Sequence, residues 1–121
     1  HGHDVGDLVI IEIGKRIREI VGTRGLVSRY GGEEFLVVFP RCEKEEAERY
    51  ASELRIAIRS APLVTPQGVS VDLTASLGLA SAPLRPDDII EEYVKVADEA
   101  LYEAKETGRD RVVSRVLAGR A

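Results

Sequence analysis

The sequence predicts an α+β fold, an α/β sandwich in which an antiparallel or mixed sheet carries helices packed on it. Three segments show helical spacing of apolar residues, and the segments between them combine β-branched residues with turn signals. The expected order is helix, hairpin, helix, strands, helix, strand. No internal repeat or low-complexity segment interrupts this order, and 121 residues suit a single domain over residues 1–121.

The composition argues against several classes of protein. Hydrophobic residues make up 44% and charged residues 31%, which is ordinary for a soluble globular domain. The net charge of −4, without a basic stripe, argues against a nucleic-acid partner and against direct contact with a membrane. The lone Cys42 excludes an internal disulfide and a cysteine-based zinc site. No apolar run approaches the roughly 18 residues of a spanning helix, so we expect a cytoplasmic protein.

Apolar residues at i, i+3, i+4 and i+7 predict the helices. We expect them over residues 4–21, 43–60 and 87–107. Gly22 suits the end of the first helix, because glycine readily adopts the left-handed conformation that closes helices. Asp87 and Asp88 are expected to open the third helix, and Gly108 to close it.

Alternating or continuous apolar runs predict the strands. We expect them over residues 26–30, 36–39, 63–65, 69–74, 73–80 and 111–115. A turn signal at residues 66–68 pairs residues 63–65 with the segment that follows. Gly31 and Gly32 are expected to join the first two strands in a tight primed turn, which requires φ > 0.

Two acidic residues, Glu33 and Glu34, follow this glycine pair directly. Carboxylates beside bare backbone amides combine cation ligands with a surface that phosphate can approach closely. Taken alone, the pattern is more typical of plain turn chemistry than of a binding site. The local sequence therefore leaves both interpretations open.

Four patterns follow one another in register along nearly the whole chain. They are Gly-His-Asp-Val-Gly-Asp at residues 2–7, Arg-Tyr-Gly-Gly-Glu-Glu-Phe at 29–35, Thr-Ala-Ser-Leu-Gly-Leu-Ala at 74–80, and Ala-Asp-Glu-Ala-Leu-Tyr-Glu-Ala-Lys at 97–105 with Gly-Arg at 108–109. Together they resemble the GGDEF family of diguanylate cyclase domains, in which Glu33 in place of Asp is a common variant. The resemblance implies a ferredoxin-like sheet, like the palm of nucleotidyl cyclases, with helices packed on it.

The resemblance also implies an activity. Two such domains, each carrying GTP, face one another as a homodimer and condense two GTP into cyclic di-GMP, releasing two pyrophosphates with the help of Mg²⁺ or Mn²⁺. An upstream sensory or receiver domain is expected to control the pairing, either in a cytoplasmic protein or in the cytoplasmic part of a membrane-bound sensor. The alternative is a catalytically inactive member that binds GTP as a regulatory or interaction module.

By resemblance, the turn supplies the metal and catalytic groups. Glu33 is expected to bind the metal ion, and Glu34 to assist the metal ion or the activation of the attacking hydroxyl. Gly31 and Gly32 would leave room for the nucleotide to lie against the turn. Arg29 and Tyr30 are interpreted as scaffold.

The remaining site residues lie far from the turn in sequence. Lys105 and Arg109 are expected to hold the β- and γ-phosphates, with Arg109 just beyond the end of its helix. Asp7 is expected to accept hydrogen bonds from the guanine edge, which favours GTP over ATP. Each has a plain alternative, because Asp7 (or Asp4) could cap the first helix, and cations near a helix C-terminus are favoured by its dipole. Asp98 is interpreted as a polar residue that ties the third helix to the sheet.

The chain departs from the family pattern in two places. The family has an N-terminal helix and a central first strand before the Gly-His motif, and this strand carries a further metal carboxylate. We expect both elements to be missing from this chain, so that the fragment alone would be inactive. The family's product-inhibition motif, Arg-x-x-Asp, falls on Gly22 and Gly25, with Arg24 out of register. We therefore expect no inhibition by cyclic di-GMP through that site.

Overall fold

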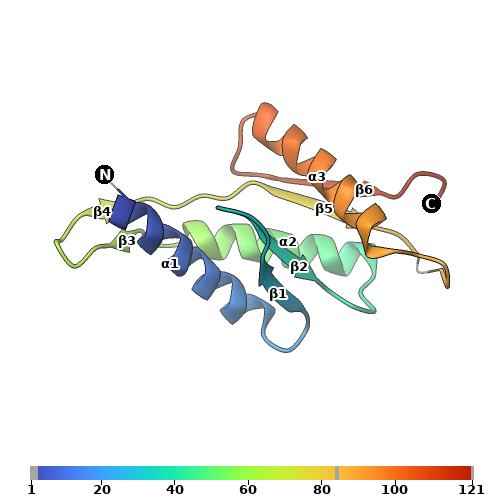
Figure 1. Ribbon diagram of the computed structural model, residues 1–121, viewed down its shortest axis with the longest axis horizontal. Coiled ribbons are helices and arrows are strands. Elements are labelled where there is room, and N and C mark those ends of the chain that lie inside the picture. The colour runs from blue at the N-terminus through green and yellow to red at the C-terminus, as the bar shows by residue number, and fades with distance from the viewer. Residues whose placement is uncertain (1–2, 84, 121) are drawn as a thin grey trace. The chain divides into compact units, whose positions relative to one another are not determined.

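The computed structural model describes residues 3–83 and 85–120. Within them it contains three helices and six strands (Figure 1). The helices are α1 (His3–Val21), α2 (Lys44–Arg59) and α3 (Ile90–Glu106). The strands are β1 (Leu26–Arg29), β2 (Phe35–Val38), β3 (Leu63–Val64), β4 (Ser70–Val71), β5 (Leu77–Ser81) and β6 (Val112–Val116). The α+β class and the order of elements are confirmed, while Gly2 of the first motif lies outside the described residues.

The strands pair in twos. β1 and β2 form an antiparallel hairpin in the register Arg29↔Phe35, and β3 and β4 pair antiparallel as the turn signal predicted. β5 and β6 run parallel and are connected through α3, the usual way to join parallel strands. The described residues therefore contain both parallel and antiparallel strand pairs. Among the same residues, no helix is long and apolar enough to cross a membrane.

The chain divides into two compact units. The first comprises the residues up to Pro40 together with Ile56–Thr74, and the second comprises Arg41–Arg55 together with the residues from Ala75 onward.

In the first unit, α1 packs beside the β1–β2 hairpin (Figure 1). Val21 is completely buried, and a Cβ on the buried Gly14 would lie only 3.1 Å from the ring of Phe35. The absence of a side chain at Gly14 thus lets the Phe35 ring lie close to the helix. Arg16 ties α1 to the end of α2, because its Nη1 donates to the carbonyl oxygens of Ile58 and Ala61 at 2.5 and 2.7 Å. The Ile58 carbonyl is one of those that a helix C-terminus leaves without a helical partner, and Ala61 lies just beyond the end of the helix.

In the second unit, α3 lies across β5 and β6 (Figure 1). Ala100 and Ala104 are completely buried on the inner face of the helix. Gly78 on β5 lies directly beneath α3, where a Cβ would be 2.9 Å from Leu101 Cα and closer still to Leu101 N and Ala97 O. Small residues on both elements therefore let helix and strand backbones meet.

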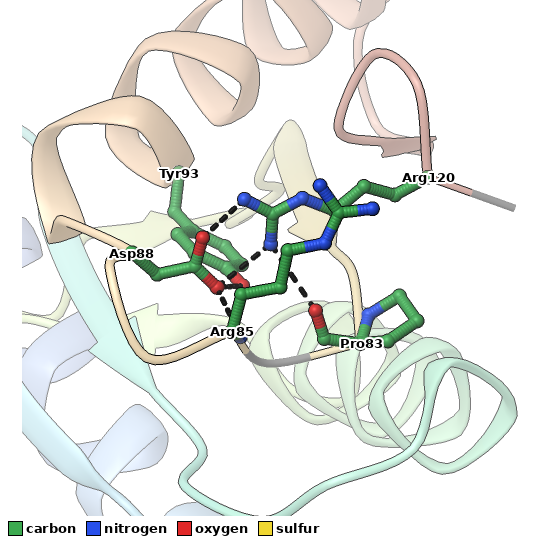
Figure 2. A network of polar contacts seen from close by, with 5 residues as sticks. All are labelled: Pro83, Arg85, Asp88, Tyr93 and Arg120. Atoms are coloured by element: carbon green, nitrogen blue, oxygen red, sulfur yellow. Dashed lines mark hydrogen bonds and ion pairs between the residues drawn. The ribbon is translucent and has the colours of Figure 1, made fainter.

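The predicted start of α3 is wrong, because the helix begins at Ile90 and not at Asp87. Asp88 serves a different purpose, shown in Figure 2. Its Oδ2 accepts hydrogen bonds from Arg85 N (2.7 Å), Tyr93 Oη (3.1 Å) and Arg120 Nη1 (2.7 Å). Its Oδ1 pairs with Arg120 Nη2, and only 5% of the Asp88 side chain and 9% of the Arg120 side chain are exposed. The C-terminal segment is thus held by a largely buried ion pair.

This ion pair predicts a specific response to acid. The Arg120 guanidinium, helped by the Arg85 amide and the Tyr93 hydroxyl, holds the pKa of Asp88 well below its ordinary value, against the opposing effect of burial. The ionised Asp88 therefore contributes stability that is fully present above about pH 4 and is lost as the pH falls further. We expect Asp88→Asn to be less stable than wild type in urea unfolding at pH 7, and this difference to shrink below about pH 4.

Asp87→Asn is the matched control for this measurement, because Asp87 is exposed and adjacent in sequence. We expect its urea midpoint to follow wild type at every pH. A stability difference between Asp88→Asn and wild type that stayed constant from pH 7 to pH 3 would contradict the assigned role of the charge.

Candidate functional site

The turn between β1 and β2 comprises five residues, 30–34. The backbone amides of Tyr30 and Gly31 both donate to the carbonyl oxygen of Glu34, at 2.8 and 3.3 Å. Neither Gly31 nor Gly32 has a positive φ, so the predicted two-residue primed turn is wrong. The reason is the register of the hairpin, because a five-residue connection can reverse the chain without left-handed residues at its glycines.

The two glycines are therefore not required by backbone conformation, and packing does not require them either. A Cβ on Gly32 would meet no atom within 4 Å, and a Cβ on Gly31 would meet only the side chain of Glu34, at 3.6 Å or more. Both glycines are exposed. The fold itself would accept a larger residue at these positions, which favours the interpretation that the bare backbone serves a ligand.

Arg29, at the end of β1, holds this turn in shape. Its Nε donates to the carbonyl oxygen of Gly31 at 3.0 Å, its Nη2 donates to that of Gly32, and its guanidinium lies 5.9 Å from the centre of the Phe35 ring. These bonds turn the glycine carbonyl oxygens toward Arg29. The scaffold role predicted for Arg29 is confirmed.

The two carboxylates of the turn differ in exposure. Glu33 is exposed at the tip, whereas Glu34 is half-buried directly before β2. Among the described residues, no group of three or more His, Cys, Asp or Glu side chains converges into a metal cage. A pair of carboxylates nevertheless fits Mg²⁺, because this ion is commonly held by one or two carboxylates and completed by substrate phosphates and water.

Asp7 lies within α1 and its side chain is exposed. Because the helix begins at His3, Asp7 is already in the second turn and cannot be the N-cap. The plain alternative for Asp7, the cap of the first helix, is thus removed, while its predicted contact with guanine stays a prediction.

Lys105 and Arg109 flank the end of α3. Lys105 is half-buried in the last turn of the helix, which ends at Glu106 with Thr107 as its C-cap. Arg109 is exposed beyond it, as predicted, and its amide donates to the carbonyl oxygen of Ala104 at 2.8 Å. Gly108 takes a φ of +129° and so closes the helix, as predicted.

The predicted site residues fall in both units. The turn and Asp7 belong to the first unit, and Lys105 and Arg109 to the second. That these residues meet in one site stays a prediction. One surface hollow of the second unit contains none of them, since it is lined by Asp98, Glu99, Tyr102, Glu103, Glu106 and Arg115.

Known proteins similar to this chain show which family it belongs to. The family model described as the diguanylate cyclase GGDEF domain matches residues 1–111. The chain belongs to the GGDEF family. Diguanylate cyclase DosC of Escherichia coli (strain K12) is 34% identical over 111 residues, which cover 92% of this chain and 24% of DosC. The chain spans between about a quarter and a third of the length of the curated relatives it matches.

Solved GGDEF structures have the same fold. The GGDEF domain of DgcB from Caulobacter crescentus, solved in complex with c-di-GMP, has a TM-score of 0.85 at 31% identity, covering 93% of this chain and 66% of that one. The active GGEEF domain of a diguanylate cyclase from Vibrio cholerae has a TM-score of 0.73 at 28% identity, covering 93% of this chain and 70% of that one. The Vibrio cholerae domain is described as GGEEF, so the third residue of its motif is Glu. Glu33 is the corresponding residue of this chain, where the family's name has Asp.

Within this GGDEF chain, the two positions of the product-inhibition motif serve the fold. Gly22 ends α1 with a φ of +55°, and a Cβ on Gly25 would lie 2.5 Å from the carbonyl oxygen of Val38. Arg24 donates to the carbonyl oxygens of Ile20 and Val21 at the end of α1. An aspartate at position 25 would therefore force the hairpin apart, and Arg24 is engaged with the helix.

In an intact protein that turns over GTP, we expect added cyclic di-GMP to cause no non-competitive inhibition through this segment. Arg24→Ala should show the same insensitivity, since its hydrogen bonds serve α1. The measurement is the rate of pyrophosphate release at increasing product concentration. Strong non-competitive inhibition would contradict the expectation, and loss of that inhibition in Arg24→Ala would assign it to this segment.

Proposed function

We propose that this chain is the catalytic GGDEF domain of a diguanylate cyclase, which condenses two GTP into cyclic di-GMP and releases two pyrophosphates. One observation carries the proposal: the glycine pair and the two carboxylates stand on a hairpin turn whose conformation and packing require no glycine. A turn left bare in this way suits a nucleotide that lies against the backbone, with Glu33 and Glu34 beside it. The family match over residues 1–111 supports the same activity.

The reaction is a nucleotidyl transfer carried out twice. The 3′-oxygen of one GTP forms a bond to the α-phosphorus of the other, the bond from that phosphorus to the bridging oxygen breaks, and pyrophosphate leaves with the electron pair. A bound Mg²⁺ or Mn²⁺ would neutralise phosphate charge and lower the pKa of the attacking hydroxyl. Glu33 would hold this ion, and Glu34 would receive or stabilise the hydroxyl proton.

The other residues bind and orient the substrate. Lys105 offers a compact charge and Arg109 a forked donor to the β- and γ-phosphates. Asp7 would accept from the N1–H and the 2-amino group of guanine, a donor pair that adenine lacks. Because each reaction joins two GTP molecules, we propose a homodimer of facing domains in the cytoplasm, controlled by an upstream sensory or receiver domain.

The test is pyrophosphate release from GTP by the intact protein in the presence of Mg²⁺, with the product identified by mass spectrometry. We expect cyclic di-GMP to form with GTP, little turnover with ATP, and none after EDTA treatment. Binding of GTP without any pyrophosphate release would instead establish the inactive regulatory module.

A further inference from the structure

The turn that follows α3 has an unusual backbone. Gly108, Arg109 and Asp110 have φ values of +129°, +60° and +46° in succession. Arg109 and Asp110 are not glycines, so their Cβ atoms make this left-handed conformation unfavourable. Such a conformation persists only when the surrounding structure holds it, and it occurs most often at functional sites.

Several contacts hold this turn. The amide of Arg109 donates to Ala104 O at 2.8 Å, and Arg111 Nε donates to Arg109 O at 3.1 Å. A further contact comes from α2, since Nη1 of Arg55 lies 3.0 Å from Oδ1 and 3.5 Å from the carbonyl oxygen of Asp110. Arg55 and Asp110 belong to the same unit, and their side chains are 26% and 29% exposed.

The ion pair between Arg55 and Asp110 acts on the residue next to Arg109. By holding both the carboxylate and the carbonyl oxygen of Asp110, Arg55 restrains the residue next to Arg109 and the peptide that follows Asp110. Fixing this neighbour in the left-handed turn limits the directions in which the Arg109 side chain can leave the backbone. A long cationic side chain on an unrestrained turn would have to be ordered at the moment of binding, which lowers affinity.

We infer that Arg55 is a positioning residue that presents Arg109 to the phosphates of GTP. The inference rests on the proposed function, since it assigns Arg55 a purpose only if Arg109 contacts the triphosphate. Sequence patterns alone did not reveal it, because Arg55 lies in an amphipathic helix 55 residues before its partner, among other charged residues.

The test compares binding of a triphosphate with binding of a monophosphate. Calorimetry on the intact protein with Mg²⁺ would use GMP and a GTP analogue whose α and β phosphorus atoms are joined by a methylene group, which prevents turnover. We expect Arg55→Ala to weaken binding of the analogue by about tenfold and to leave GMP binding unchanged within about twofold. Arg55→Lys, which keeps the charge, should recover part of the loss.

Arg115→Ala is the matched control, because it removes an ion pair of the same unit, with Glu103, that includes neither Arg109 nor Asp110. We expect this variant to keep the wild-type ratio of analogue to GMP affinity. In an Arg109→Ala background, Arg55→Ala should cause no further loss, because the group it positions is gone.

The outcomes distinguish failure of the positioning role of Arg55 from failure of the phosphate role proposed for Arg109. If Arg109→Ala lowers the affinity ratio and Arg55→Ala does not, the inference fails and the role of Arg109 stands. If Arg109→Ala leaves the ratio unchanged, the phosphate role of Arg109 fails and the inference with it. Equal loss of analogue and GMP binding in Arg55→Ala would overturn the inference in favour of a purely structural role. Should Arg55→Ala not fold, Asp110→Ala removes the acceptor instead, and an unchanged ratio there overturns the inference equally.

Discussion

Glu34→Gln is expected to slow pyrophosphate release from GTP by at least about 100-fold in the intact protein. Gln has the shape of Glu but no charge, so it neither binds a divalent cation strongly nor accepts a proton. The substitution keeps the backbone bonds that close the hairpin turn, because the amides of Tyr30 and Gly31 donate to the carbonyl oxygen of residue 34. The measurement is kcat with GTP and Mg²⁺, together with the thermal midpoint of each protein.

The control for this prediction is Glu45→Gln, which makes the same chemical change in the exposed first turn of α2. Its kcat and thermal midpoint should both match wild type. A kcat for Glu34→Gln within about threefold of wild type would remove Glu34 from the catalytic group. Loss of activity accompanied by a large fall in the thermal midpoint would instead identify a structural residue.

Gly78→Ala is expected to lower the free energy of unfolding by roughly 2–3 kcal/mol. The added Cβ would overlap Ala97 O, Leu101 N and Leu101 Cα, all of which are backbone atoms of α3. Backbone cannot rotate away as a side chain can, so the helix must shift from β5 and disturb the packing of the completely buried Ala100 and Ala104. Urea unfolding of the intact protein measures the change.

Gly6→Ala makes the same substitution where the structure has room. Gly6 lies inside α1, has no positive φ, and a Cβ there would meet no atom within 4 Å. Alanine is the better helix former, so we expect this variant to be as stable as wild type or more stable by about 0.5–1 kcal/mol. Equal urea midpoints for Gly78→Ala and wild type would contradict the close approach of α3 to β5.

The elements that could be predicted from the sequence are those governed by local periodicity. α1 and α2 end within one residue of their predicted ends, because an amphipathic stripe and a following glycine or proline are local features. The β1–β2 and β3–β4 pairs also follow from neighbouring residues. The strand expected over residues 73–80 begins only at Leu77, where pairing with Val112 begins, and Val112 lies far along the chain.

The candidate site, like the fold, has features that the local sequence predicts and features that it does not. Its residues were identified by motif, and the structure places Glu33 and Glu34 on a turn and Arg109 just past its helix, as predicted. The conformation of the glycine pair could not be predicted, because hairpin register and turn length decide it. The convergence of Asp7, the turn, Lys105 and Arg109 stays a prediction.

The sequence by itself determined the α+β class, the order of the elements, the family and the candidate site residues. Only the tertiary structure decided which charges meet. Asp88 was expected to start a helix but pairs with Arg120, 32 residues away, and Asp110 pairs with Arg55 of α2. The physical reason is that helix caps and turns depend on a few adjacent residues. An ion pair instead depends on which surfaces the hydrophobic core brings together, and no local pattern encodes that.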